Sequence, residues 1–330
     1  MSRGPGWRSF GVAALCGGLL VAVAGCLEAP REPLRVGVNA WPPFELLYLA
    51  REKGFFRDEG VEVDLIDFSS YTGILRSYHQ GNLDAFFATL NEILIAENFQ
   101  DLPAVVLVAD YSYGGDALVV RGGLESLGQL RGKKIAFEES ALGSYVLERI
   151  LELGGLRTGE VVAINRLPEE GEQDFQRGAV DAVITYEPGL GRLLRGEPGA
   201  RAIFTSRDIP GEIVDVLVLR RAALHERAAD ARRMMKAWFR ALAYLKENPH
   251  QASEVMAKRQ RVTVAEFLGG LRGAHIPDLE ENRRLMGSSG TPGPLHQTAA
   301  RLGEFLVRRG LARKTASGAE LLHHALIESL

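Results

Sequence analysis

Short apolar runs alternate with amphipathic stretches over most of the chain that follows residue 33. The runs have the length and composition of buried strands and lie at 34–38, 61–66, 84–88, 104–109, 117–120, 134–137, 161–167, 181–185 and 214–219. Apolar residues at helical spacing lie between several of them, at 44–53, 71–80, from 91 onward and at 143–153. This alternation predicts βαβ units around mainly parallel sheets.

The last third of the chain has a different pattern. Helical periodicity predicts helices at 222–248, 249–260, 264–273 and 295–310, and the Gly- and Ser-rich segment 287–294 is typical of a flexible connection. The sequence contains neither an internal repeat nor a low-complexity tract. The pattern therefore predicts two α/β lobes followed by a helical C-terminal region.

The first residues have the pattern of an export signal. Two arginines and no acid accompany an apolar stretch at 10–25, which is shorter than the roughly 20 residues of a membrane span. Val23-Ala24-Gly25-Cys26 ends the stretch and resembles the lipobox of bacterial lipoproteins, where the chain is cut before a cysteine that receives a lipid. We predict a signal peptide at 1–25, lipidation of Cys26 and a tether at 26–33. A plain secretory signal with a chance cysteine is the alternative.

Composition excludes two classes of protein. The 330 residues include 2 Cys, of which Cys16 would leave with the signal peptide, so a disulfide framework is excluded. Lys and Arg number 39 against 42 Asp and Glu, for a formal charge of -3. The broad basic surface typical of nucleic-acid binders is therefore absent, and we expect no nucleic-acid partner.

Several strings resemble one known family, and they follow its order along the chain. They are 34–56 with Trp41-Pro42-Pro43-Phe44-Glu45, Gly81-Asn82-Leu83-Asp84-Ala85, Leu130-Arg131-Gly132-Lys133-Lys134, Val180-Asp181-Ala182-Val183, Tyr186-Glu187-Pro188 and 237–245. Together they cover nearly all of residues 34–315. The chain resembles the substrate-binding proteins of bacterial ABC importers, in the nitrate, sulfonate and taurine group that includes binders of thiamine precursors (NMT1/THI5-like).

This resemblance implies a periplasmic-binding-protein type II fold, in which two α/β lobes joined by a two-strand hinge hold ligand between them. Lobe 1 is then expected at 34–117 and 216–330, including the C-terminal helices, and lobe 2 at 118–215. The crossings are expected near Ala117-Leu118 and Asp215-Val216. The resemblance also implies an exported monomer, anchored through the lipid on Cys26 in the periplasm or at the outer cell surface. Its partners would be a small-molecule solute and the ABC permease and ATPase subunits.

Candidate ligand-binding residues follow from the rule that ligands bind outside the carboxyl ends of strands in open α/β sheets. The predicted loops at these ends are aromatic and acidic, and contain no Lys, Arg or His. The candidates are Trp41, Phe44, Glu45, Thr89, Asn91, Glu92, Tyr113, Asp116, Glu138, Gly143, Ser144, Tyr145, Tyr186 and Glu187. Such a cleft favours an amine-bearing solute, cationic or zwitterionic, for example a pyrimidine-type thiamine precursor, because carboxylates pair with its charge.

Other interpretations stay open. An anion such as a sulfonate, taurine, nitrate or bicarbonate is the alternative ligand, because the family resemblance implies anion donors at the helix start Gly143-Ser144-Tyr145. Glu92 has the spacing from Thr89 of a capping box. Glu45 and Glu187 lie where a carboxylate stabilises the first turn of a helix without any ligand.

Enzymes of the same fold, pyrimidine synthases and dehydratases of menaquinone biosynthesis, are the alternative of another class. The 7 histidines are scattered without Cys or acidic partners at ligand spacing, so the sequence predicts no metal site. It has neither a Gly-rich phosphate loop with its Lys nor a Gly-x-Ser-x-Gly elbow. We therefore expect a binding protein without catalytic residues or a cofactor.

Overall fold

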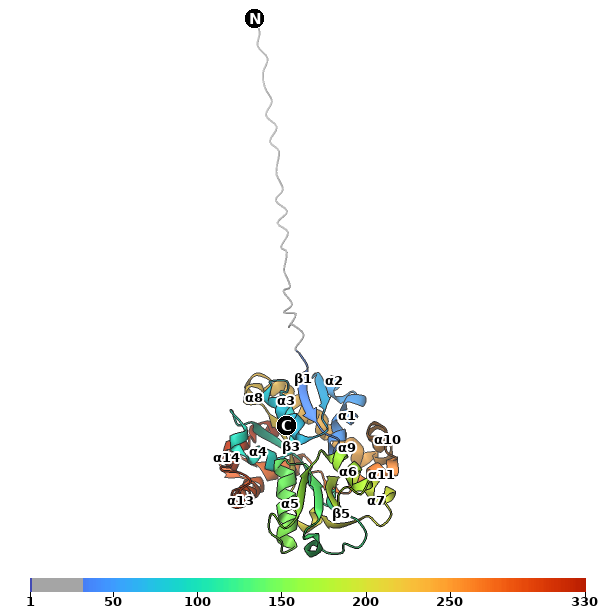
Figure 1. The fold of residues 1–330 in the computed structure, drawn as a ribbon. Helices are drawn as coiled ribbons and strands as arrows, with labels where there is room; N and C mark the ends of the chain where they lie inside the picture. Colours follow the sequence, from blue (N-terminus) through green and yellow to red (C-terminus); the bar gives the residue numbers. More distant parts are fainter. Residues whose placement is uncertain (2–31) are drawn as a thin grey trace. The chain divides into compact units, whose positions relative to one another are not determined.

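The computed structural model describes residue 1 and residues 32–330. The predicted signal peptide beyond residue 1, Cys26 and most of the predicted tether lie outside the described residues. The folded unit extends from Pro33 to Leu330 (Figure 1). Among the residues described, no helix combines the length and the apolar composition that a membrane span requires.

A six-stranded sheet of order β11-β4-β10-β3-β1-β2 forms the centre of the first lobe. Its strands are β1 (Leu34–Val38), β2 (Val63–Asp67), β3 (Ala85–Thr89), β4 (Ala104–Ser112), β10 (Val214–Leu219) and β11 (Ala274–His275). β1 pairs in parallel with β2 and β3, whereas β10 runs antiparallel to β3 and β4. A strand from the second half of the chain thus completes a sheet begun by the first hundred residues.

The second lobe contains a five-stranded sheet of order β7-β6-β8-β5-β9. Its strands are β5 (Asp116–Val120), β6 (Lys134–Phe137), β7 (Val162–Asn165), β8 (Ala182–Tyr186) and β9 (Arg201–Thr205). β6 is parallel to β7 and β8, and β5 is antiparallel to β8 and β9. The apolar pattern did not predict β9, because this edge strand begins and ends with polar residues.

The chain passes between the sheets twice, from β4 to β5 and from β9 to β10. The hydroxyl oxygens of Ser112 and Ser206 are 2.8 Å apart, and the Gly114 N–H donates to Ser206 Oγ at 2.6 Å. These bonds tie the two passages together as a two-strand hinge. The crossings expected near Ala117-Leu118 and Asp215-Val216 instead lie inside β5 and β10. The lobe boundaries drawn there stay a prediction.

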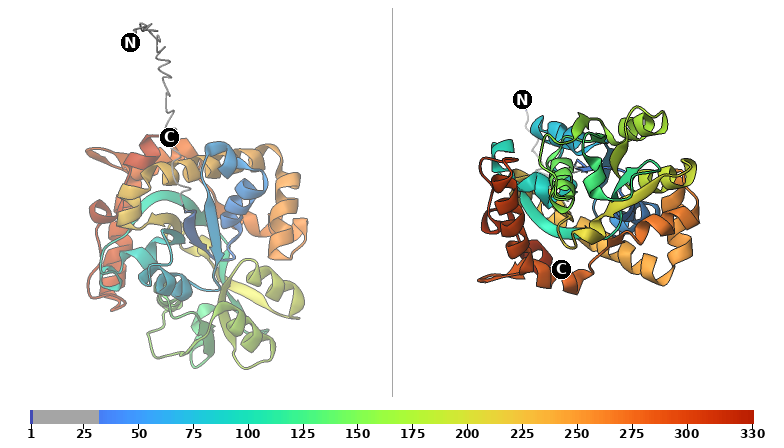
Figure 2. Two further views of the ribbon diagram at one scale, coloured as in Figure 1. Left: turned by 90° about the horizontal axis from the view of Figure 1, so that it is seen from above. Right: turned by 60° about the horizontal axis from the view of Figure 1, so that its bottom comes forward.

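Helices flank both sheets. Lobe 1 carries α1 (Glu45–Glu52), α2 (Phe55–Glu59), α3 (Tyr71–His79), α4 (Leu90–Leu94), α8 (Arg221–Glu226), α9 (Ala228–Glu247), α10 (Pro249–Gln260), α11 (Val264–Leu271), α12 (Leu279–Met286), α13 (Pro294–Arg308), α14 (Gly318–Leu321) and α15 (Ala325–Glu328). Lobe 2 carries α5 (Ala141–Leu153), α6 (Pro168–Gln176) and α7 (Gly189–Gly196). In the left view of Figure 2, the green to yellow part of the chain forms one body beside the blue, orange and red parts.

Short elements complete the fold. They are the 3-10 helices η1 (Pro42–Phe44), η2 (Ala96–Asn98), η3 (Leu127–Leu130) and η4 (Ser206–Asp208) and the strands β12 (Gly287–Ser288) and β13 (Thr291–Pro292). The last two pair with each other, so 287–294 contains a small hairpin rather than the flexible connection predicted from its composition.

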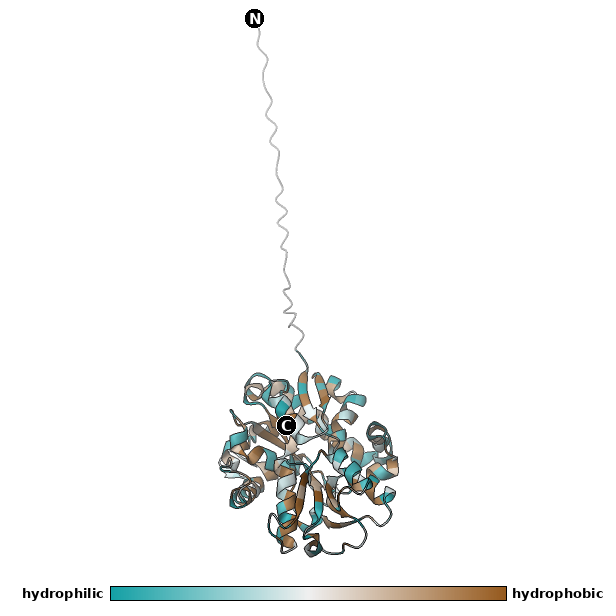
Figure 3. Cartoon of the chain, in the orientation of Figure 1, coloured by the Kyte–Doolittle hydropathy of each residue, from teal (hydrophilic) through white to brown (hydrophobic). Residues whose placement is uncertain are grey.

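The core confirms the predicted fold class of two α/β lobes with a helical C-terminal region. Hydrophobic colouring concentrates on the central strands, and the outer surfaces of the helices are largely hydrophilic (Figure 3). β10 is buried at each of its 6 residues, including Asp215. A charged residue within such a strand is unusual unless it has a partner or a function, and it marks the position of the site.

Candidate functional site between the two lobes

Three carboxylates lie buried next to the hinge, and we call Asp110, Asp116 and Asp215 the carboxylate cluster. Their exposed fractions are 0%, 6% and 2%. Asp110 lies near the end of β4 and is the register partner of Asp215 in β10, and Asp116 begins β5. Within residues 32–330, no basic side chain forms an ion pair with any of the three, and none is a main cause of their pKa shifts. The cluster therefore brings three carboxyl groups together where water is excluded.

Burial is the main cause of a raised pKa at each member of the cluster. It raises the pKa of Asp116 to about 6, although the Ser112 hydroxyl opposes this. Burial, followed by the charge of Asp116, raises the pKa of Asp215 to about 8. Burial and the charge of Asp215 raise the pKa of Asp110 well above its ordinary range. Near neutral pH, the cluster thus holds protons in place of a cation.

Aromatic side chains from both lobes surround these acids. Trp41 Nε1 donates to both carboxylate oxygens of Asp110, at 3.0 and 3.1 Å, and the Tyr71 hydroxyl donates to Asp215 Oδ1 at 3.2 Å. Trp41 of lobe 1 meets Tyr186 of lobe 2 edge to face, with ring centroids 6.1 Å apart. The two rings thus connect the lobes next to the carboxylate cluster.

Three buried polar side chains at or just after strand ends of lobe 1 lack partners. Within residues 32–330, the amides of Asn39 and Asn91 and the hydroxyl of Thr89 are buried and form no hydrogen bond. Asn39 follows β1, and Thr89, which ends β3, is the register partner of Asp215. Unsatisfied buried polar groups cost stability, so their retention beside the carboxylates indicates a ligand site.

Two further acids reach from one lobe to the other. Glu92 in α4 accepts the N–H of Leu142 in the first turn of α5 at 2.9 Å. Glu138, after β6, accepts the N–H and the hydroxyl of Thr72 in the first turn of α3, at 3.2 and 2.9 Å. Each carboxylate thus occupies a helix N-terminus of the opposite lobe, where an anion is stabilised. The capping box predicted for Thr89 and Glu92 is wrong, because Glu92 points to α5 instead.

Burial also raises the pKa of these two interlobe acids. The pKa of Glu92 is raised to about 7, and hydrogen bonds from the start of α5 oppose the effect of burial. The pKa of Glu138 is raised as well, against the hydrogen bonds from Thr72.

A cavity of about 450 Å³ lies between the lobes. Its lining comes from lobe 1 with Ala40, Asp67, Phe68, Ser69, Arg259, Gln260 and Arg261, and from lobe 2 with Pro168, Glu169, Glu172, Tyr186, Pro188, Gly189 and Arg192. Tyr186 connects this cavity to the carboxylate cluster, because it is the strand partner of Asp116. The strand-end loops contain no basic residue, but three arginines from other elements line the cavity, so the cavity is less acidic than those loops suggest.

Three of the predicted ligand-binding residues contact other protein side chains and do not line the interlobe cavity. Phe44 is fully buried against Phe87, with ring centroids 4.8 Å apart. Glu45 is fully buried and forms an ion pair with Arg259 at 2.7 Å. Tyr113 is 51% exposed and lies beneath the Arg207 guanidinium. Apolar packing places Phe44 in the core, and an internal ion pair occupies Glu45.

Tyr145 lies on the face of α5 that packs against the C-terminal helix α13. Its ring contacts Phe305 at 4.7 Å between centroids, and its hydroxyl donates to Glu212 Oε2 at 2.6 Å. Tyr145 does not line the interlobe cavity; it lines a separate pocket with Arg149, Glu212 and Phe305. Its predicted ligand contact is therefore not supported by its placement.

The remaining predicted residues lie at helix starts in lobe 2. A Cβ on Gly143 would lie 1.9 Å from the Glu138 carbonyl oxygen, so only glycine fits at this close approach. The backbone N–H of Ser144 donates to the Ser140 carbonyl within the first turn of α5. Glu187 Oε2 accepts the Gly191 N–H at 3.2 Å and so caps α7, as the helix-start interpretation predicts. The ligand roles of all three stay predictions.

The strand-end rule missed Tyr71 and Asp215, and also the arginines at the end of α10. Asp215 carried a usable signal, because a single acid interrupts the apolar run 214–219. The arginines carried no such sequence signal, because α10 does not follow a strand and reaches the cavity only through the tertiary fold. No group of three or more His, Cys, Asp or Glu within residues 32–330 has an arrangement that could hold a metal ion.

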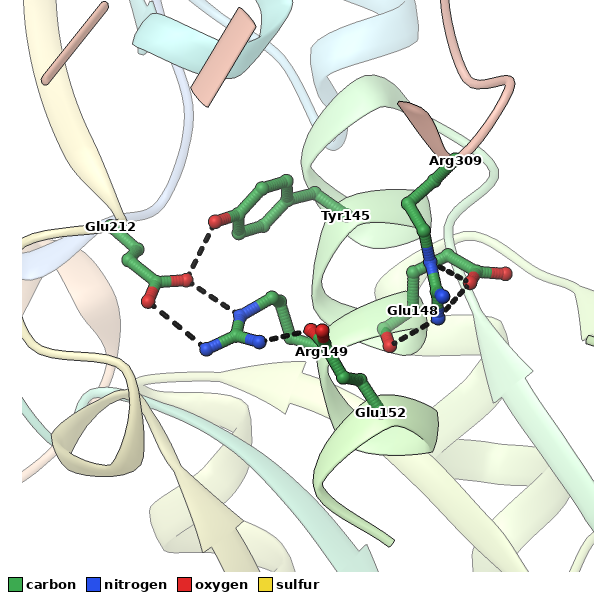
Figure 4. Close-up of polar contacts among 6 residues, drawn as sticks. All are labelled: Tyr145, Glu148, Arg149, Glu152, Glu212 and Arg309. Atoms are coloured by element: carbon green, nitrogen blue, oxygen red, sulfur yellow. Dashed lines mark hydrogen bonds and ion pairs between the residues drawn. The ribbon is translucent and has the colours of Figure 1, made fainter. Parts of the chain in front are cut away.

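A polar network of α5 residues with Glu212 and Arg309 links the lobes (Figure 4). Arg149 donates to Glu212, in the passage before β10, from Nε at 2.8 Å and from Nη2 at 3.2 Å. Arg309, directly after α13, donates from Nε to Glu148 Oε2 at 2.9 Å. Glu148 Oε1 also accepts the hydroxyl of Thr158 at 2.6 Å. The network therefore fixes α5 against both the C-terminal region and the hinge.

We expect Arg309→Met to lower the free energy of unfolding by about 1–3 kcal/mol, because Glu148 would lose the cationic partner of a side chain that is 7% exposed. Arg308→Met is the matched control, since this neighbouring exposed residue forms no ion pair within the described part of the chain. Urea denaturation of both variants measures the difference. Equal losses in the two variants would contradict this role of Arg309.

The fold is that of periplasmic binding proteins, with two α/β lobes and a site between them. The alkanesulfonate-binding protein SsuA from Xanthomonas axonopodis pv. citri, solved bound to MOPS, superposes with a TM-score of 0.74 at 17% identity, over 89% of this chain and 99% of that one. The sequence model of the NMT1-like family matches residues 28–259. The chain belongs to the NMT1-like family.

Two relatives extend the comparison. A binding protein of Brucella abortus (strain 2308) is 25% identical over 245 residues, which are 72% of this chain and 74% of the relative. The taurine-binding periplasmic protein of Escherichia coli (strain K12) is 27% identical over 139 residues, which are 42% of this chain and 43% of that protein. Both relatives are named for binding rather than for catalysis.

Proposed function

We propose that the protein is the solute-binding component of an ABC importer and captures an amine-bearing organic solute between its lobes. The observation that carries the ligand class is the carboxylate cluster, which is buried without a basic partner among residues 32–330 and lies next to unpartnered amides. An ammonium group entering the cluster would replace the protons that burial imposes and would donate hydrogen bonds to the carboxylates and to Asn side-chain oxygens.

The two helix starts that face the opposite lobe support the same ligand class. Glu92 occupies the N-terminus of α5, and Glu138 occupies that of α3. A free sulfonate or nitrate at either place would have to displace a carboxylate of the protein. The donors that the family resemblance implies for an anion are thus already engaged in this chain.

A sulfonate or another anion is the second candidate ligand. The names of the relatives favour it, because one is a taurine-binding protein and a structural neighbour is an alkanesulfonate-binding protein. The arginines in the lining of the interlobe cavity also favour it. Taurine carries an amine and a sulfonate, so a zwitterion satisfies both sets of observations.

A thermal-shift screen followed by calorimetry tests the proposal. Two matched sets of compounds separate the effect of the amine from that of the anionic group. One set is taurine, ethylamine and ethanesulfonate, and the other is ε-aminocaproate, hexylamine and caproate. An aminopyrimidine is a further cation. We expect amine-bearing compounds to raise the melting temperature and to bind with 1:1 stoichiometry without turnover. A shift given by ethanesulfonate or caproate alone would favour the anion. Conversion of a bound compound to product would favour the enzyme alternative.

Export and anchoring belong to the same proposal. The apolar segment before Cys26 and the periplasmic relative support a lipoprotein that presents the folded unit outside the cytoplasm. We expect metabolic labelling with a fatty acid to mark the wild-type protein and not Cys26→Ser, which should leave the membrane fraction. Equal labelling of both would contradict the anchor, and Cys16→Ser is the matched control.

A further inference from the structure

The three arginines in the lining of the interlobe cavity differ in their ion-pair partners. Arg259 donates to Glu45 and to Asp67, and Arg192 forms an ion pair with Glu172 at 3.0 Å. Within residues 32–330, the guanidinium of Arg261 forms neither a hydrogen bond nor an ion pair. Arg261, an exposed residue, is thus the arginine of this cavity lining that has no ion-pair partner in the described part of the chain.

The backbone of Arg261 is strained as well. Its φ of 57° and ψ of 39° place it in the left-handed region, and among residues 32–330 no other non-glycine residue has a positive φ. The position is the C-cap of α10, where glycine adopts this conformation without steric cost. A large side chain here does not serve the helix end, and strain of this kind in a cavity lining is typical of a functional position.

Gln260 fixes the location of the strained residue. Its Nε2 donates to the Ala40 carbonyl oxygen at 3.3 Å, which joins the end of α10 to the loop that carries Trp41. Arg261 therefore lies on the lobe 1 side of the cavity, and Tyr186 on the lobe 2 side connects that cavity to the carboxylate cluster. The cavity thus has a guanidinium in its lining and the buried carboxylate cluster next to its Tyr186 side.

We propose that Arg261 binds the anionic end of the solute while the carboxylate cluster holds its amine, so that the protein selects a zwitterion such as an amino sulfonate or an ω-amino acid. The inference rests on the proposed function and adds the residue that binds the anionic group of the solute. At about 450 Å³, the cavity lies within the range of organic-ligand sites and has room for a solute longer than taurine. Glu169, in the first turn of α6, is the carboxylate of the lining that has no ion-pair partner among residues 32–330, and Arg261 is the lining cation that can bind an anionic group.

The test compares Arg261→Gly with wild type by calorimetry and thermal unfolding. Arg261→Gly should weaken ε-aminocaproate or taurine at least tenfold and leave hexylamine or ethylamine within twofold. Its melting temperature without ligand should equal or exceed that of wild type, because glycine accepts the left-handed backbone. Arg261→Lys should retain part of the zwitterion affinity. Arg272→Gly, the same change at the C-cap of α11 outside the cavity lining, should alter neither affinity.

The outcomes separate this inference from the function it rests on. Amine binding by wild type with unchanged zwitterion affinity in Arg261→Gly overturns the role of Arg261 alone. A lower melting temperature with unchanged affinities assigns Arg261 to the helix end and also overturns it. If wild type binds neither zwitterions nor amines, the proposed function fails and the inference fails with it.

Discussion

Asp215→Asn is expected to reduce affinity for the amine-bearing compound that gives the largest shift in the screen by at least about 30-fold, or roughly 2 kcal/mol. The substitution keeps the shape of the side chain and an oxygen that accepts the Tyr71 hydroxyl, and removes one negative charge from the carboxylate cluster. The same variant should be more stable than wild type without ligand at pH 8, by on the order of 1–3 kcal/mol, because it buries no ionised group. Calorimetry and urea denaturation measure the two effects.

Lower amine affinity together with higher ligand-free stability in Asp215→Asn distinguishes a ligand site from a structural one. A structural carboxylate would lose stability when changed to the amide, and ligand affinity would fall only as far as the fold is damaged. Asp64→Asn is the matched control, because Asp64 is an exposed residue of β2 in the same sheet. Undiminished amine affinity in Asp215→Asn would refute the role of the cluster.

The second large effect is a pH dependence of binding. A cation binds the ionised cluster. Burial raises the pKa to about 6 at Asp116 and to about 8 at Asp215, and it raises the pKa of Asp110 well above its ordinary range. Affinity for an amine should therefore increase between pH 6 and pH 8, by up to about tenfold per pH unit for each proton released. Calorimetry in buffers of different ionisation enthalpy counts those protons.

The stability of the ligand-free protein should change with pH in the other direction. For a carboxyl whose pKa is higher in the folded than in the unfolded state, the stabilisation is complete below the unfolded pKa and is lost as pH increases through the folded pKa. The melting temperature without ligand should thus decrease from pH 5 to pH 8. An amine affinity that is flat or decreasing over pH 6–8 would contradict the cluster as the cation site.

The fold was largely predictable from apolar periodicity, whereas the site was predictable only where it follows the sheet edge. The rule of the carboxyl strand ends found Trp41, Asp116 and Tyr186, which lie beside one another in the structure. It also selected Phe44 and Tyr145, because the rule assigns a residue to a loop or first turn and cannot tell which way its side chain points. Packing against Phe87 and Phe305 decides that.

The strand-end rule cannot predict residues that elements far along the chain bring to the site. Arg261 reaches the cavity through the packing of α10, whose Gln260 is 220 residues from its partner Ala40, and nothing local in the sequence marks Arg261. Asp215 is the opposite case. Its signal was present as one acid in an apolar strand, and only its pairing with Asp110 in the folded sheet shows that two carboxylates meet there.

Calorimetric titration of the purified protein at pH 8 with ε-aminocaproate, hexylamine and caproate tests the central claim most directly. We predict 1:1 binding of ε-aminocaproate, weaker binding of hexylamine and no measurable binding of caproate, since the carboxylate cluster requires the amine. The taurine set of the same three kinds should follow the same order. Binding of caproate or ethanesulfonate as tight as that of the amine-bearing compounds would contradict the account.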